Sequence, residues 1–93
     1  MPLFGSNQDG TLIVYFGRAG VPMTIYALNE QGEKRVQTYV VETQSIGKSQ
    51  CAVILKLKQG YYEVIEPNHP EFKGRKVYVT SGYIQEVNLL FDY

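Results

Sequence analysis

Gln59-Gly60-Tyr61-Tyr62-Glu63-Val64 is the stretch of sequence that decides the fold of this chain. Many sandwich domains begin a late strand with this pattern: a glycine, a tyrosine two residues later and then β-branched residues in alternation. Alternation of apolar and polar residues is the two-residue period of a half-buried β-strand. Because the pattern recurs between turn-forming residues along the chain, we predict an all-β fold.

Seven segments show this alternation at intervals of about 10–12 residues, which is typical of β-sandwiches. The predicted strands span residues 11–16, 21–28, 33–42, 50–58, 61–66, 75–80 and 83–91. We predict a polar loop at residues 43–49 and a hairpin turn at Ser81-Gly82. The predicted fold is an antiparallel β-sandwich of about seven strands, Ig-like or prealbumin-like, and a small closed barrel is the alternative.

The length of the chain fits one domain with one small core. Its 93 residues are 44% hydrophobic and 19% charged, a balance that favours a globular over a disordered chain. We predict an N-terminal arm at residues 1–10, in which a short apolar cluster is followed by small polar residues. Residues 11–93 are predicted to form a single sandwich domain. The arm is expected to dock on the domain or on a neighbouring molecule.

The charge balance argues against two classes of partner. Nine basic and nine acidic residues give a net charge of zero, so no long-range attraction draws the chain to nucleic acid or to an anionic membrane. The longest apolar run, Cys51 to Leu55, is far too short for membrane insertion. No signal peptide is visible at residues 1–5, so we expect cytoplasmic synthesis or assembly into a particle.

The residues that usually carry catalysis or bind metals are scarce. Cys51 is the only cysteine and excludes an internal disulfide, and His69 is the only histidine. A Cys-His couple would have to form across the fold, and His69 with Glu66 and Glu71 falls short of the ligand set that zinc usually takes. We therefore predict no catalytic residue, no metal site and no cofactor, and a small enzyme is the least favoured function.

Four segments occur in an order that a known family shares: Gly20–Tyr26, Thr43 with Gly47, Leu57–Val64 and Gly82 with Val87–Leu89. Through these segments the chain resembles carboxypeptidase-regulatory-like domains, which are prealbumin-like sandwiches related to the transthyretin fold. The resemblance extends over about residues 11–91. The resemblance implies a non-catalytic accessory or interaction module. The hydroxyisourate hydrolase of the same broad fold needs a histidine-rich site and a C-terminal Tyr-Arg-Gly-Ser, whereas this chain ends Phe91-Asp92-Tyr93.

Tyrosine is the one compositional excess, with eight tyrosines and no tryptophan. By strand parity, five of them lie on the face opposite the predicted core: Tyr15, Tyr26, Tyr39, Tyr61 and Tyr78. Tyrosine is a good strand former that is often half-exposed, which is the simpler interpretation. It is also enriched at interfaces, so we predict that the five bind a protein partner or a second copy. The chain would then be a structural or accessory subunit of a larger assembly such as a virion, and a carbohydrate-binding module is the alternative.

Overall fold

The computed structural model describes residues 9–48, 50–67 and 74–89. Every regular element in these ranges is a β-strand, which confirms the predicted all-β fold, and no helix there could cross a membrane. The eight strands are β1 (Gly10–Phe16), β2 (Pro22–Leu28), β3 (Arg35–Glu42), β4 (Gln44–Gly47), β5 (Gln50–Leu57), β6 (Gly60–Ile65), β7 (Arg75–Val79) and β8 (Ile84–Asn88).

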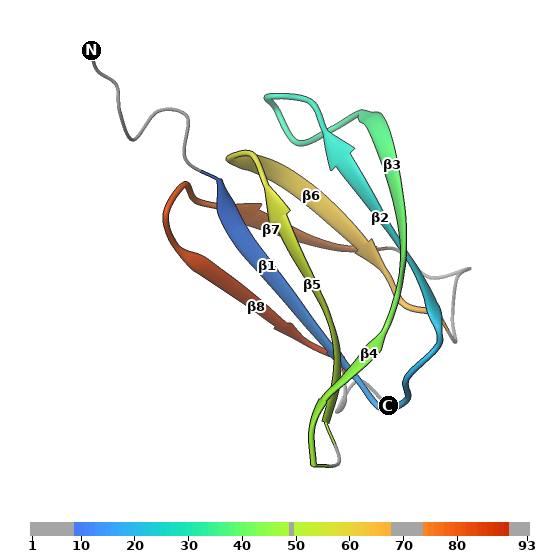
Figure 1. Ribbon diagram of the computed structural model, residues 1–93. Coiled ribbons are helices and arrows are strands. Elements are labelled where there is room, and N and C mark those ends of the chain that lie inside the picture. The colour runs from blue at the N-terminus through green and yellow to red at the C-terminus, as the bar shows by residue number, and fades with distance from the viewer. Residues whose placement is uncertain (1–8, 49, 68–73, 90–93) are drawn as a thin grey trace.

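The strands form two four-stranded sheets that pack face to face, so the predicted sandwich is confirmed (Figure 1). Sheet A has the order β4-β5-β1-β8, and sheet B has the order β3-β2-β6-β7. Figure 1 is viewed from the side of sheet A, where β1 and β5 pass in front of β7. All neighbouring strands are antiparallel except β1 and β8, which pair in parallel.

The core lies between the two sheets and follows the alternation of the sequence. In β1 every second residue is buried, and the same holds for Tyr62 and Val64 in β6. Each large apolar side chain that is fully buried contributes roughly 1.5–3 kcal/mol. The buried apolar cluster consists of Leu12, Val14, Phe16, Met23, Ile25, Val53, Leu57, Tyr62, Val64, Val79, Val87 and Leu89.

The connection from β5 to β6 carries the chain from sheet A to sheet B, and Tyr62 secures it. The ring of Tyr62 is buried in the core, and its hydroxyl donates a hydrogen bond of 2.6 Å to the carbonyl oxygen of Lys58. A tyrosine that bonds back to the backbone a few residues upstream is the tyrosine corner of Ig-like sandwiches. The sequence signal at residues 59–64 therefore marks this corner.

The prediction of a polar loop at residues 43–49 is wrong, because Gln44–Gly47 form β4 at the edge of sheet A. Only Thr43 separates β3 from β4, so one edge segment leaves sheet B and continues in sheet A. All four residues of β4 are exposed. A strand with no buried face shows no apolar alternation, and the sequence pattern therefore does not reveal it.

Ser81-Gly82 is a turn, but the predicted hairpin is wrong because β7 belongs to sheet B and β8 to sheet A. The Tyr83 N–H donates to the Thr80 carbonyl oxygen at 3.0 Å, and Gly82 has a φ of 82°, which favours glycine. The turn thus links the two sheets. Turn residues predict where a chain reverses, but not which sheet the next strand joins.

The face of β3 that packs on the core is also opposite to the prediction. The predicted outward orientation of Tyr39 is wrong, because Tyr39 pairs with Ile25 of β2 and packs against the core, whereas Val36 and Val40 are 65% and 67% exposed. Both faces of this strand are apolar, so its pairing with β2 decides the orientation. Strand parity also predicts that Leu28 points outward, like Tyr26. Leu28 is buried instead, because the pairing register of β2 and β3 shifts after Ala27.

Candidate functional site

The outer face of sheet B brings together three of the five predicted tyrosines. Tyr26 comes from β2, Tyr61 from β6 and Tyr78 from β7. Tyr61 pairs directly with Tyr78, and Tyr26 pairs with Glu63, two residues from Tyr61 on the same face. We call these three tyrosines, with Glu63 and Arg35, the tyrosine face. It is the candidate functional site.

Tyr61 and Tyr78 form an aromatic pair at one end of the tyrosine face. Their ring centroids lie 4.7 Å apart with an interplanar angle of 71°, which is an edge-to-face contact. The two residues are 39% and 41% exposed. Each ring is therefore held by its neighbour while a large part of its surface stays available for contact.

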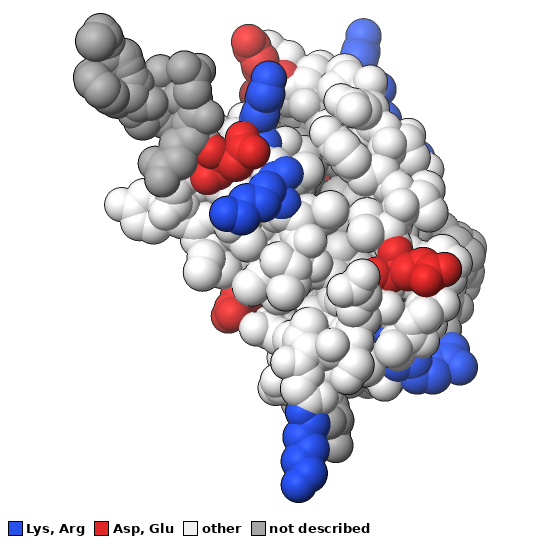
Figure 2. Space-filling view, in the orientation of Figure 1, with Lys and Arg blue, Asp and Glu red and all other residues white. Residues whose placement is uncertain are grey.

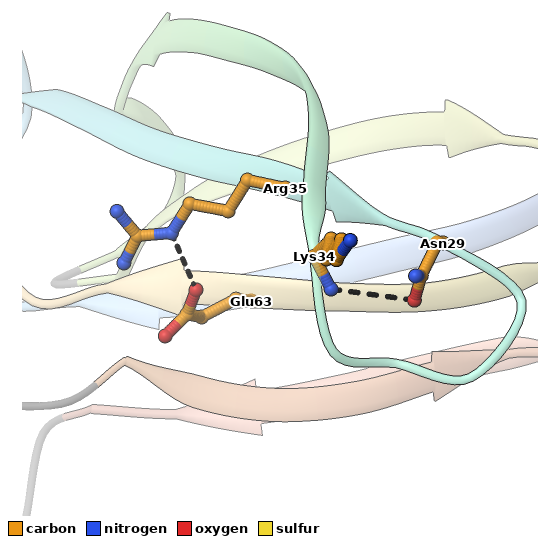
Figure 3. A network of polar contacts seen from close by, with 4 residues as sticks. All are labelled: Asn29, Lys34, Arg35 and Glu63. Atoms are coloured by element: carbon orange, nitrogen blue, oxygen red, sulfur yellow. Dashed lines mark hydrogen bonds and ion pairs between the residues drawn. The ribbon is translucent and has the colours of Figure 1, made fainter.

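The loop between β2 and β3 covers one side of Tyr61. The loop is held by Asn29, whose Oδ1 accepts a hydrogen bond of 3.3 Å from the Lys34 N–H and whose own N–H donates to the Lys34 carbonyl oxygen at 2.8 Å (Figure 3). Gly32 lies against the ring, and a Cβ at that position would be 3.1 Å from Cγ of Tyr61. With its φ of 73°, Gly32 lets the backbone approach the ring as no other residue would.

Arg35 and Glu63 fix the other end of the tyrosine face. Arg35 Cζ lies 3.9 Å from the ring centroid of Tyr26, and its Nε donates to Glu63 Oε1 at 2.9 Å (Figure 3). This hydrogen bond raises the pKa of Arg35, so the guanidinium stays charged. Gly74 packs on Glu63, because a Cβ there would overlap the Glu63 side chain. The contacts add little stability at an exposed site, but they hold the guanidinium flat on Tyr26.

A shallow hollow of about 500 Å³ lies beside the aromatic pair. Tyr61 and Tyr78 line one part of it, and Asn29, Glu30 and Gln59 supply polar side chains. Amide and carboxylate groups beside aromatic rings can bind a peptide through its backbone or a sugar through its hydroxyl groups.

The other two predicted tyrosines lie elsewhere. Tyr15 is on the outer face of sheet A, where its hydroxyl donates to Glu86 Oε2 at 2.9 Å, a bond that raises the pKa of Tyr15. In Figure 2, viewed from that side, charged side chains lie around the margin and leave the middle free of charge. Tyr39 packs inward. The five tyrosines therefore do not form one surface, since parity gives the side of a strand but not the sheet that the strand joins.

Arg35 and Glu63 are the members of the tyrosine face that were not predicted. From the sequence alone, the basic pair Lys34-Arg35 indicates a solvated strand end, and strand parity indicates that Glu63 faces outward from β6. Their contact depends on the positions of β3 and β6 on either side of β2. This arrangement joins segments far apart in the chain, and no local signal in the sequence encodes it.

The residues considered for catalysis or metal binding do not form a site in the described ranges. Cys51 lies in β5, where it pairs with Phe16, and its thiol is free of any disulfide. Across residues 9–48, 50–67 and 74–89, no three His, Cys, Asp or Glu side chains lie close enough to hold a metal ion. His69 and Glu71 fall outside the described residues, as do residues 1–8 of the predicted arm.

Tyr62, which lies beneath the tyrosine face, gives a prediction about pH. Burial, together with the charges of Tyr39 and Asp9, raises the pKa of Tyr62 above 10.0. Tyr62 therefore contributes its full stabilisation of the fold below pH 10, and this stabilisation is lost as the pH rises through the folded-state pKa of Tyr62. We expect Tyr62→Phe to cost about 1 kcal/mol at neutral pH through the lost hydrogen bond, and this cost to shrink above about pH 10. Urea unfolding of both proteins between pH 7 and 11 tests this; a cost that stays constant contradicts it.

The chain matches no protein-family model, no curated protein and no solved structure.

Proposed function

We propose that this chain is a non-enzymatic interaction module that binds a protein partner through the tyrosine face. The observation that carries the proposal is the half-exposed pair of Tyr61 and Tyr78 on the same face as the guanidinium of Arg35, which is held over Tyr26. Tyrosine and arginine are enriched at protein interfaces and among the residues that dominate binding energy. Side chains already held by their neighbours lose little conformational freedom on binding, which favours affinity.

The wider role that we propose is an accessory or decoration subunit of a larger assembly, such as a virion. The resemblance to carboxypeptidase-regulatory-like domains supports this role, since it implies a non-catalytic accessory module. The scarcity of nucleophile-base pairs in the sequence supports a non-enzymatic function as well.

The proposal predicts that Tyr78→Ser and Arg35→Ala each weaken binding to the natural partner at least about tenfold, because each removes a residue of the kind that dominates interfaces. The partner is identified by co-purification with the chain from its native source, and affinity is then measured by calorimetry with purified components. Tyr83→Ser is the matched control, since Tyr83 is 70% exposed and lies in the β7–β8 turn, outside the tyrosine face. Equal affinity for all four proteins would refute the proposal.

Carbohydrate binding is the second candidate, and the hollow beside Tyr61 favours it. Sugar rings stack on aromatic side chains, and Asn29, Glu30 and Gln59 offer hydrogen-bonding groups next to the two tyrosines. A glycan array separates the two candidates. Binding that is lost in Tyr78→Ser and kept in Tyr83→Ser would support this candidate, whereas an array without hits would remove it.

A further inference from the structure

The outer edge of β3 is an unpaired strand edge. Sheet B ends at β3, and none of the strands in the described ranges pairs with its open side. Six of its eight residues are exposed, among them the apolar Val36 and Val40. Long, apolar and exposed edges are the sites where another strand can add to a sheet.

The backbone of β3 offers hydrogen-bonding groups along this edge. The Thr43 N–H donates to the Val21 carbonyl oxygen at 3.0 Å, and the Thr43 carbonyl oxygen accepts from the Gly20 N–H at 2.8 Å, so residue 43 bonds toward the β2 side. In an antiparallel ladder, alternate residues bond to opposite sides. The N–H and C=O groups of Thr38, Val40 and Glu42 therefore point to the open side.

The other three edge strands are short or carry charged residues along them, whereas β3 is eight residues long and carries charges only at its two ends. Lysine, arginine and glutamate side chains and short length all protect edges. β4 is only four residues long, β7 contains Arg75-Lys76, and β8 carries Glu86 at its centre. Between Arg35 and Glu42, β3 has neither a charged residue nor a proline. An edge without such protection favours a form of the protein in which another strand pairs with β3.

The ends of β3 indicate which strand would pair with it. Lys34 directly precedes β3 and Glu42 ends it, so two copies in antiparallel order can bring Lys34 of each against Glu42 of the other. An antiparallel pair of identical strands also has the twofold symmetry of most protein dimers. We infer that β3 pairs with β3 of a second copy of this chain, which joins the two B sheets into one continuous sheet. This dimer uses the edge of sheet B and leaves the aromatic pair of Tyr61 and Tyr78 accessible.

Sedimentation equilibrium of the full chain tests this inference. We expect a mass that rises with concentration from 10.6 kDa toward twice that value. Val40→Lys should weaken the dimer by about tenfold or more, because the register that sets Lys34 against Glu42 also sets position 40 against Val36, so each lysine would lie against an apolar side chain of the other copy. Ile84→Lys is the matched control, since Ile84 is 65% exposed but lies on β8, and it should leave the mass unchanged.

A charge exchange tests the orientation of the two strands. Glu42→Lys should weaken the dimer by setting like charges together, and the double variant Glu42→Lys with Lys34→Glu should restore it. A monomer at all concentrations would overturn the inference, and so would a dimer that Val40→Lys and Ile84→Lys affect equally. Loss of partner binding in the tyrosine variants with an intact dimer would leave this inference standing.

Discussion

Thr43→Val is expected to lower the free energy of unfolding by roughly 2–4 kcal/mol, because it leaves two backbone groups without partners. Thr43 is 2% exposed, and its hydroxyl accepts a hydrogen bond of 3.0 Å from the Val21 N–H and donates one of 2.5 Å to the Arg18 carbonyl oxygen. Valine has nearly the shape of threonine but cannot make either bond. Because Thr43 ties the β1–β2 turn to the point where the edge strand changes sheets, we expect the loss to affect both sheets.

Urea unfolding followed by circular dichroism measures this effect. Thr43→Ser is the control, since it keeps the hydroxyl and removes one methyl group, at a cost of about 1 kcal/mol. An equal loss of stability in the two variants would show that packing, rather than hydrogen bonding, makes Thr43 important.

Gly10→Ala is expected to destabilise the fold by about 2–3 kcal/mol, because the added methyl group has no space. Gly10 is buried at the start of β1, and a Cβ there would lie 2.5 Å from the carbonyl oxygen of Thr80 and 2.5 Å from Cγ1 of Val79. The Thr80 oxygen belongs to the backbone, so it can move only if the end of β7 and its turn move too.

Thermal and urea unfolding would compare Gly10→Ala with Gly47→Ala. Gly47 is also a strand glycine, but its nearest neighbour would be 3.8 Å from the new methyl group, so we expect a change of less than about 0.5 kcal/mol. If both variants unfold at the same midpoint, β1 and β7 do not meet as closely as described.

The sequence predicts the strands well where one face is buried. β1 and β6 alternate clearly because every second residue enters the core, and Gly60 with Tyr62 marks a corner between the sheets. β4 escapes detection because it buries nothing. In β3 either face could have been buried, and only its pairing with β2 decides between them.

The candidate site is predicted only in part. Parity correctly places Tyr26, Tyr61 and Tyr78 outward, because each lies between residues that face the core. It cannot separate them from Tyr15, which faces outward from the other sheet. The contact between Arg35 and Glu63 depends on strand order, which residue periodicity does not contain.

The parallel pairing of β1 and β8 has a mechanical consequence. The two strands run side by side from Thr11 opposite Ile84 to Tyr15 opposite Asn88. Tension applied at the start of β1 and the end of β8 pulls the strands along their length in opposite directions. It therefore loads the hydrogen bonds between them together, in shear, and does not peel them apart one by one. Resistance to extension along this direction is built into the connectivity of the sandwich.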